Sequence, residues 1–422
     1  MARPEYLERN LVFAIGGYDG KEALKTTEVL NLFTSKWEAG PPMTTGRRGA
    51  AMVTYDMQIF VFGGYGDGGG GQGLLNTTEV FDIASWEWRA GIPMPSRRCD
   101  FAAAVLDGSV FAAGGRCDGD VSSLVEEFDI NSQRWETCAP LQKARAGLAM
   151  TSQSGRLFSV GGDVGSKYVE EVGIVETFEP EKGAWENGPP MLMRRCNPAI
   201  SSYGGRIFVI GGFGSRYGGG GYGDGRFLDT MEVFDQAAGA WEYGPRLCHQ
   251  RCALGVAIIP SVRKMLVLGG PFAGVGKTTA EVFDMNTMAR TSAPAPPLQR
   301  WGVCVAAHDG EGLRDKRTKL QRKTSARVAM TEAIAARDVP GLRAALSAAQ
   351  VAGLEPEELA VVAKLLKNYE ETGWLAGATE SSGEELLQFS ALSSATSNAV
   401  LSDTTFLTSV ARQTSVADSF DV

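Results

Sequence analysis

Six Gly-Gly pairs recur along the first two thirds of the chain at a nearly constant spacing. They are Gly16-Gly17, Gly63-Gly64, Gly114-Gly115, Gly161-Gly162, Gly211-Gly212 and Gly269-Gly270, and successive pairs lie about 50 residues apart. Each pair ends an apolar run such as Ile59–Phe62, as expected where a strand ends and the backbone needs the freedom of glycine. A unit of this length cannot bury its own faces, so the fold depends on how the units stack.

Each copy of the repeat has the pattern of four short strands. The clearest copy, residues 97–141, has an apolar run at Phe101–Leu106, a turn at Asp107-Gly108, a second run into Gly114-Gly115 and two further strands before a proline. This order predicts a four-stranded antiparallel meander. A glutamate lies on the third strand of every copy and a tryptophan on the fourth strand of five copies: Glu28, Glu79, Glu126, Glu176, Glu232, Glu281, and Trp37, Trp88, Trp135, Trp185, Trp241, with Met288 near the tryptophan position of the sixth.

These glycines, glutamates and tryptophans are the residues of the kelch motif, and residues 10–308 resemble a kelch-repeat β-propeller. The resemblance implies an all-β, six-bladed propeller. The region is similar to the kelch domain of kelch-like adaptors of cullin ubiquitin ligases, but their BTB and BACK domains have no room before residue 10.

The first copy begins at its second strand, because Asn10–Gly17 already ends in a Gly-Gly pair and residues 1–9 are too polar to supply a strand. A suitable first strand is found at residues 300–307, after which no further Gly-Gly strand follows. We therefore expect residues 300–307 to complete the blade that residues 10–40 begin. Such closure removes the exposed strand edges of an open array.

Three segments follow the predicted propeller. Residues 309–327 are a basic linker, and residues 374–422 are a Ser/Thr-rich acidic tail that we expect to be largely disordered. Residues 328–373 predict a helical hairpin, with helix starts at Asp338–Pro340 and Glu355–Glu358. An apolar stripe along it contains Leu342, Leu346, Leu354, Leu359, Val362 and Leu366.

Composition excludes several classes of protein. A formal net charge of −8 disfavours nucleic-acid binding. Seven cysteines without a framework spacing, and no secretory signal ahead of the first strand, favour the cytoplasm. The apolar runs are too short to span a membrane.

The links between copies and the loops between strands two and three share one end of a propeller, called here the first face. It carries irregular inserts at Gly66–Gly73, residues 163–173 and Ser215–Gly225. Function on a rigid scaffold is concentrated in variable loops, which predicts partner contacts by Tyr65, Lys167, Tyr168, Arg216, Tyr217 and Tyr222. Alternatively, the inserts are merely tolerated.

An arginine precedes the first strand of every copy: Arg48, Arg98, Arg145, Arg195, Arg251 and Arg300. Because first strands line the central channel, these guanidinium groups would converge near its mouth and bind an acidic or phosphorylated peptide. Arginines at this point of the repeat hold acidic motifs in the kelch-like adaptors that the region resembles. The alternative is structural, with each arginine paired to a glutamate of its repeat.

The remaining motifs favour structural roles. Cys99, Cys196 and Cys252 follow ring arginines and are either reactive thiols or small packed side chains. Lys264–Thr279 lacks the first glycine of a phosphate-binding loop, because Pro271 occupies its place. His249 and His308 lie far apart in the sequence and match no catalytic motif.

We therefore expect a non-catalytic adaptor that uses neither metal nor cofactor and captures a protein or acidic peptide. The resemblance implies cullin ligase components or actin as partners. The alternatives are an actin-binding scaffold or a carbohydrate-processing enzyme on the same fold.

Overall fold

The computed structural model describes residues 9–66, 73–165, 173–214, 226–270, 279–310, 323, 325–330, 332–334, 338–354 and 356–372. Two compact units divide the chain, Met1–Gly310 and Glu311–Val422. The predicted tail, residues 374–422, lies outside the described residues, as does most of the expected basic linker, 309–327.

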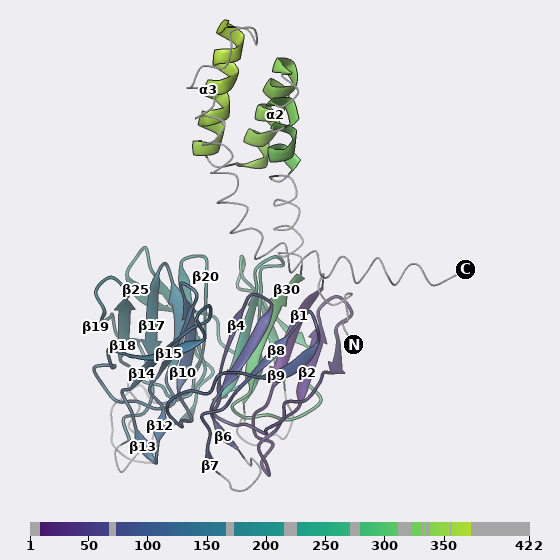
Figure 1. Ribbon diagram of the computed structural model, residues 1–422. Helices are drawn as coiled ribbons and strands as arrows, with labels where there is room; N and C mark the ends of the chain where they lie inside the picture. Colours follow the sequence, from purple (N-terminus) through teal and green to yellow (C-terminus); the bar gives the residue numbers. More distant parts are fainter. Residues whose placement is uncertain are drawn as a thin grey trace. The chain divides into compact units, whose positions relative to one another are not determined.

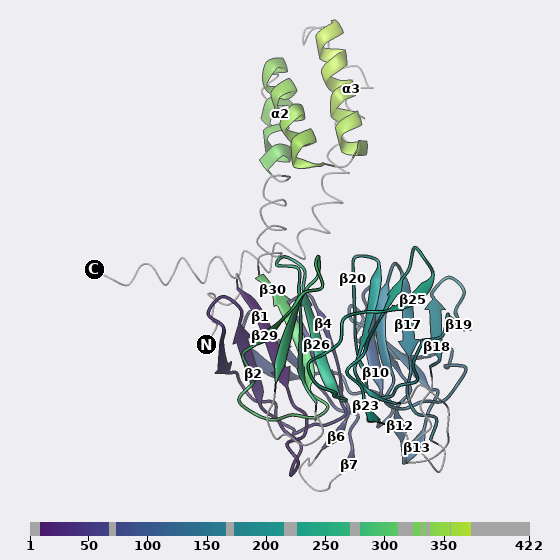
Figure 2. The ribbon, with the colours of Figure 1, turned by 180° about the vertical axis from the view of Figure 1, so that it is seen from behind.

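Six four-stranded antiparallel sheets form the first unit, which is a six-bladed β-propeller, as predicted (Figures 1 and 2). Blade 1 contains β30 (Cys304–Asp309), β1 (Asn10–Ile15), β2 (Thr27–Asn31) and β3 (Lys36–Ala39). Blade 2 contains β4 (Ala51–Tyr55), β5 (Gln58–Phe62), β8 (Thr78–Asp82) and β9 (Glu87–Ala90). Blade 3 contains β10 (Ala102–Leu106), β11 (Ser109–Ala113), β14 (Val125–Asp129) and β15 (Arg134–Cys138).

The other three blades repeat this order. Blade 4 contains β16 (Ala149–Gln153), β17 (Arg156–Val160), β18 (Val175–Glu179) and β19 (Ala184–Asn187). Blade 5 contains β20 (Ala199–Tyr203), β21 (Arg206–Ile210), β24 (Met231–Asp235) and β25 (Ala240–Tyr243). Blade 6 contains β26 (Leu254–Ile259), β27 (Lys264–Gly269), β28 (Ala280–Asp284) and β29 (Arg290–Ala293).

Short two-stranded ribbons extend the loops of the first face in blades 2, 3 and 5. They are β6 (Tyr65–Gly66) with β7 (Gly73–Leu74), β12 (Arg116–Cys117) with β13 (Asp120–Val121), and β22 (Phe213–Gly214) with β23 (Arg226–Phe227). Figure 1 shows the first two ribbons at the same end of the propeller.

The two ends of the propeller sequence meet in blade 1. Strand β30 pairs antiparallel with β1, and Leu11 lies opposite His308. The predicted closure is therefore confirmed, although the closing strand covers Cys304–Asp309 rather than residues 300–307.

Strand composition follows from position in the blade. In β10, Ala102, Ala104 and Leu106 are buried between blades, while Ala103 and Val105 are half-buried. Strand β11 is buried on both sides and is apolar except for Ser109. The two strands meet at a two-residue turn in which Asp107 and Gly108 have φ angles of 50° and 82°, as hairpin turns of this length require.

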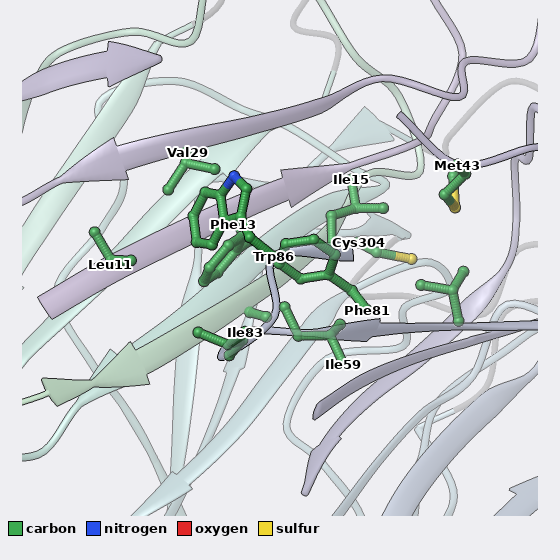
Figure 3. Close-up of a cluster of buried hydrophobic side chains, with 12 residues drawn as sticks. Leu11, Phe13, Ile15, Val29, Met43, Ile59, Phe81, Ile83, Trp86 and Cys304 are labelled. Atoms are coloured by element: carbon green, nitrogen blue, oxygen red, sulfur yellow. The ribbon is translucent and has the colours of Figure 1, made fainter. Parts of the chain in front are cut away.

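Apolar side chains fill the space between neighbouring blades. Figure 3 shows the cluster between blades 1 and 2, where Phe13 of β1 lies against Phe81 of β8 and against Trp86. Cys304 of the closing strand belongs to the same cluster, so ring closure also completes this part of the core.

The second unit contains α2 (Val339–Ala352) and α3 (Pro356–Thr372). Asp338 caps α2 by accepting a hydrogen bond from the Gly341 N–H at 3.0 Å, as expected from the sequence. The predicted stripe lies in one buried cluster, with Leu359 at its margin.

The structure adds a helical segment to the predicted hairpin. Residues 325–330 and 332–334 are helical, and Ala326, Met330, Ala333 and Ile334 pack into the cluster of α2 and α3. These four residues have the spacing of one helix face, so helix begins inside the segment that we expected to be linker.

Candidate functional site

The arginine before each first strand is buried and paired inside its own blade. Arg98, Arg145, Arg195, Arg251 and Arg300 are at most 1% exposed. The sixth member is Arg47, also 1% exposed, and not the predicted Arg48. This arrangement is the structural alternative, so we correct the expectation that five of the predicted guanidinium groups converge at the channel mouth, those of Arg98, Arg145, Arg195, Arg251 and Arg300.

Each buried arginine meets the glutamate on the third strand of its own blade. The guanidinium–carboxylate distance is 3.0 Å for Arg47–Glu79, 2.8 Å for Arg98–Glu126, and 2.9 Å for Arg145–Glu176, Arg251–Glu281 and Arg300–Glu28, and Arg195 pairs with Glu232 in the same way. Burial lowers the pKa of each arginine, and the paired carboxylate opposes this shift. The same arginines also donate to the carbonyl of the first glycine in the Gly-Gly pair of their blade, as Arg195 does to Gly211 at 2.8 Å.

The glycine pairs connect one blade to the next. In all six copies the N–H of the second glycine donates to the carbonyl of the buried arginine in the following blade, at 2.8–3.0 Å. At Gly161, where φ is 64°, an added Cβ would lie 2.4 Å from the Arg195 carbonyl oxygen. The buried arginine, its paired glutamate and the Gly-Gly pair of each blade therefore form one structural unit, which holds the blade to its neighbour and is buried away from any ligand.

A backbone ring surrounds the central channel on the first face. The residue two positions after each buried arginine has a positive φ angle, between 49° and 61°. These six residues are Gly49, Asp100, Gly147, Asn197, Ala253 and Gly302. Five N–H···O=C bonds of 2.6–2.9 Å link these residues from blade to blade, beginning with Asp100 to Gly49 and ending with Gly302 to Ala253.

The residues that directly follow the buried arginines and the glycine pairs form the rim of this ring. Their backbones pair in isolated β-bridges, Tyr18 with Trp301, Arg48 with Tyr65, Cys99 with Arg116, Ala146 with Asp163, and Cys196 with Phe213. The rim therefore differs in chemistry from blade to blade, although the scaffold beneath it is regular.

The aromatic sector of the rim holds an exposed cation. The Arg48 guanidinium carbon lies 4.8 Å from the ring centre of Tyr18 and 4.8 Å from that of Tyr65. Trp301, which is 38% exposed, meets Tyr18 edge-on at 5.8 Å. Arg48 is exposed, and no described residue accepts a hydrogen bond from its side chain. Two aromatic faces thus flank an exposed guanidinium group.

The neighbouring sector carries charges of both signs. Arg116 pairs with Asp163 at 2.8 Å. Asp100 lies at the ring itself, where burial raises its pKa while Arg116 and Arg48 oppose the shift. Cys99, the residue before Asp100, forms a backbone bridge with Arg116, and Asp100 Oδ1 would lie 2.4 Å from a Cβ added at Gly49, the residue after Arg48. The two sectors therefore border the same opening.

The cysteines that follow ring arginines lack the environment that a reactive thiol needs, in agreement with the packing alternative. Burial raises the pKa of Cys99 and Cys252 to about 12, whereas a reactive cysteine needs a lowered pKa. Cys196 is buried. These residues fill space at the start of inner strands.

Among the predicted loop contacts, Tyr65 lies on the rim. Lys167, Tyr168, Arg216, Tyr217 and Tyr222 lie outside the described residues, as does Pro271–Thr278 of the glycine-rich segment. We did not predict Tyr18, Trp301, Arg116 and Asp163 as rim residues. Their signal is positional, since each directly follows a Gly-Gly pair or a buried arginine.

The described residues of the propeller line at least two hollows. One of about 300 Å³ occupies the central channel and is lined by the inner strands of all six blades. The other, about 370 Å³, lies beside blade 5 and is lined by residues that include Phe227, Tyr243 and Arg246.

The described residues contain no group of three or more His, Cys, Asp or Glu side chains placed to hold a metal ion. Within the same residues, the helices are too short or too polar to cross a membrane.

Comparison with known proteins agrees with the repeat pattern. Residues 6–212 match the family model described as KLHDC2/KLHL20/DRC7 Kelch-repeats domain, and residues 194–247 match the Kelch motif. The chain is 32% identical over 107 residues to Kelch-like protein 40 of Xenopus laevis, covering 25% of this chain and 17% of the relative. It is 30% identical over 106 residues to Kelch-like protein 35 of Mus musculus, covering 25% and 18%. The matched region thus spans less than a fifth of the length of these relatives.

A solved structure, "Structure of YjhT", aligns with a TM-score of 0.55 and 16% identity over 67% of this chain and 97% of that one. At this identity the likeness concerns the fold alone.

Proposed function

Because this chain is a kelch-repeat protein whose repeats close into a six-bladed propeller, we propose that it is a non-catalytic capture module. It binds a segment of a partner protein at the rim of the first face. The Arg48 guanidinium, exposed between Tyr18 and Tyr65, is the observation that supports this site most directly.

The chemistry of the rim favours an acidic segment. Arg48 offers several donors to a carboxylate or phosphate, and the aromatic faces on either side restrict its orientation before binding. The six buried arginines contribute by holding the rim in place. Burial also raises the pKa of Cys304, and it is the main cause that raises the pKa of Cys138, each to about 12, so these two thiols are poor nucleophiles.

Titration of a fluorescent Glu-rich peptide tests the proposal. Arg48→Ala should weaken binding about tenfold or more, because hydrogen bonds to charged groups contribute about 1.5–3 kcal/mol. Arg89→Ala is the matched control, since it removes an exposed arginine from the outer strand of the same blade. Equal affinity for wild type and Arg48→Ala, or an equal loss with Arg89→Ala, would refute the site.

The partner is best identified by affinity purification with wild type and Arg48→Ala side by side. Cullin components lost with the variant would make the protein a ligase adaptor, whereas loss of actin would make it a cytoskeletal protein.

A further inference from the structure

The hollow beside blade 5 lies in a blade that adjoins neither blade 1 nor blade 2, which carry the aromatic sector of the rim. Its volume is about 370 Å³, at the small end of ligand sites. The loop between β21 and β24 supplies residues 226–230 of its lining, and the link from β25 to blade 6 supplies Tyr243, Gly244, Arg246 and Gln250. Both segments belong to the first face.

The floor of this hollow is formed by buried side chains. Met193, Leu228 and Thr230 line it and are at most 7% exposed. The Thr230 hydroxyl accepts a hydrogen bond from Arg195 at 3.2 Å and lies 3.6 Å from Met193 Sδ, to which it donates. A ligand therefore meets mainly the exposed wall, which consists of Arg226, Tyr243, Arg246 and Gln250.

The backbone that carries Arg226 is fixed by its neighbours. Gly214 lies opposite Arg226 in the ribbon of β22 and β23, and a Cβ added at Gly214 would overlap the Arg194 carbonyl oxygen. Two residues after Arg226, the Leu228 N–H donates to the Gly212 carbonyl at 2.8 Å. The Arg226 side chain is exposed, and no described residue pairs with it. Its position is thus set by the scaffold, and its donors remain for a ligand.

Arg246 is held in place through Asp229. The Arg246 Nη1 donates to both carboxylate oxygens of Asp229, at 3.1 and 3.2 Å, and the Leu247 N–H donates to the Asp229 carbonyl at 2.8 Å. The Arg246 side chain is 71% exposed, and its Nη2 and Nε donate to none of the described residues. One acid therefore orients this guanidinium, which keeps donors for a second acid.

Blade 6 adds a third arginine at the same link. Arg290 lies opposite Phe283, in the register at which the other five blades have their tryptophan, so Arg290 and not Met288 occupies the tryptophan position. Four of those tryptophans donate the indole N–H to a backbone carbonyl of the link that enters their blade. Arg290 donates to the Arg246 carbonyl at 2.8 Å instead. The replacement keeps the contact between blades and adds a positive charge beside Arg246.

Positive charge exceeds negative charge around this hollow. Its lining contains two arginines and one acid, Asp229. Arg290 lies 3.8 Å from Glu281, but that carboxylate is buried and already pairs with Arg251 at 2.9 Å. An oxyanion in the hollow would therefore be attracted, and it could accept charge-assisted hydrogen bonds from more than one guanidinium.

We propose that the hollow is a second ligand site and binds a phosphate group carried on an aromatic ring. The arginines offer the donors that a phosphate accepts, and Phe227 and Tyr243 line the same hollow, where a flat ring can pack against them. Tyr243 is 48% exposed, so covering it contributes to binding. A free aryl phosphate and a phosphorylated tyrosine of another protein share this chemistry. The site goes beyond the capture of an acidic segment at Arg48 and does not depend on it.

Isothermal titration calorimetry with phenyl phosphate tests the site. The titrations use the full chain with Arg48→Ala, which removes the arginine of the rim as a competing site. Adding Arg226→Ala or Arg246→Ala should weaken binding about tenfold or more, because each removes a charged donor. Asp229→Asn should strengthen binding severalfold, because it removes the negative charge that competes for Arg246.

Arg206→Ala is the matched control. Arg206 also belongs to blade 5, is exposed and pairs with an aspartate, Asp235, at 3.5 Å. It stands at the start of β21, at the opposite end of the blade, so its loss should leave binding unchanged. Since Arg206, Arg226 and Arg246 are all exposed, these variants should keep the folded structure, which circular dichroism checks.

Three other probes define the ligand. Inorganic phosphate and benzoate should each bind severalfold more weakly than phenyl phosphate, because one lacks the ring and the other carries a smaller charge. A short alanine peptide with blocked ends and one phosphotyrosine distinguishes the sources. Tighter binding of this peptide than of phenyl phosphate supports the site as one for a protein partner, and weaker binding supports it as one for a free aryl phosphate.

The outcomes are separate from those of the rim. Binding of phenyl phosphate in the Arg48→Ala chain supports the blade 5 site whether or not the Glu-rich peptide binds at the rim. No binding, equal affinity in the Arg226→Ala and Arg206→Ala variants, or equal affinity for benzoate and phenyl phosphate would overturn the inference.

Discussion

The buried pair Arg195–Glu232 gives the strongest prediction about stability. Both side chains are fully buried. Arg195 also donates to Gly211 O at 2.8 Å and to Thr230 O at 3.2 Å. Glu232 also accepts hydrogen bonds from the N–H groups of Leu192 and Met193. The pair therefore joins the loop between β21 and β24 of blade 5 to the link that enters this blade from blade 4.

Replacing Glu232 with alanine leaves the Arg195 charge buried without its counter-ion. Breaking such a pair costs about 3–5 kcal/mol. A domain of this size loses about 2 °C in melting temperature per kcal/mol, so we expect a decrease of about 6–10 °C. Thermal unfolding followed by tryptophan fluorescence measures the change, since Trp241 lies in the same blade.

A double-mutant cycle separates the pair from its surroundings. Arg195→Met combined with Glu232→Leu should be less destabilising than the sum of the single changes, because no buried charge remains. Arg194→Met is the matched control: this neighbour is exposed, and its loss should change stability by less than about 0.5 kcal/mol. A loss below about 1 kcal/mol with Glu232→Ala, or equal losses at Arg194 and Arg195, would refute the structural assignment of these arginines.

Three further predictions concern other parts of the propeller. Gly161→Ala should destabilise the protein by several kcal/mol more than Gly155→Ala. Both glycines have positive φ angles, for which an L-residue costs about 1–2 kcal/mol, but a Cβ at Gly161 would lie 2.4 Å from a carbonyl oxygen, whereas a Cβ at Gly155 would point into open space. Chemical denaturation of the two variants measures the difference. Asp100→Asn should raise the melting temperature at pH 7 but not near pH 4. Burial raises the folded-state pKa of Asp100, so its ionisation costs stability as pH rises above the unfolded value of about 3.9; a difference that stays constant with pH would contradict this. A chain that ends at Gly310 should have the same oligomeric state as the full chain, whereas one that ends at Gln299 should associate further, because it lacks β30. Light scattering distinguishes them.

The repeat made the architecture predictable. Glycine pairs, glutamates and tryptophans mark the ends and faces of strands, which are local properties of the sequence. The first copy lacks its first strand, and the matching strand after the last copy revealed how the ring closes. Blade 6 keeps the fold without its tryptophan, since Met288 packs at the margin of the core there.

The role of the arginines was not predictable from spacing. Whether a long side chain extends toward the channel or folds back on its own blade depends on its path in space. We chose Arg48 over Arg47 because the second arginine is the repeat residue in Arg97-Arg98 and Arg194-Arg195. This choice was wrong, because in Arg47-Arg48 the first arginine is the buried one. The left-handed residue two positions later, seen as glycine in Arg47-Arg48-Gly49 and Arg145-Ala146-Gly147, is the better reference.

Tyr18 and Trp301 of the rim escaped prediction for a related reason. They come from opposite ends of the propeller sequence and meet only because the ring closes. Their individual positions showed no composition that differs from an ordinary loop.

Blade 1 can be completed only after the ribosome has made the whole propeller, because one of its four strands, β30, is the last to be synthesised. Arg300 donates a hydrogen bond to Gly16, which precedes it by 284 residues. At about 5–20 residues per second, a ribosome needs about 15–60 s to make the partner that β1 awaits. During that interval the nascent strand lacks the blade 6 residues that bury Val12 and Ala14 in the finished protein. Chaperones that shield emerging apolar segments should therefore act on the amino-terminal end of this chain before any other part.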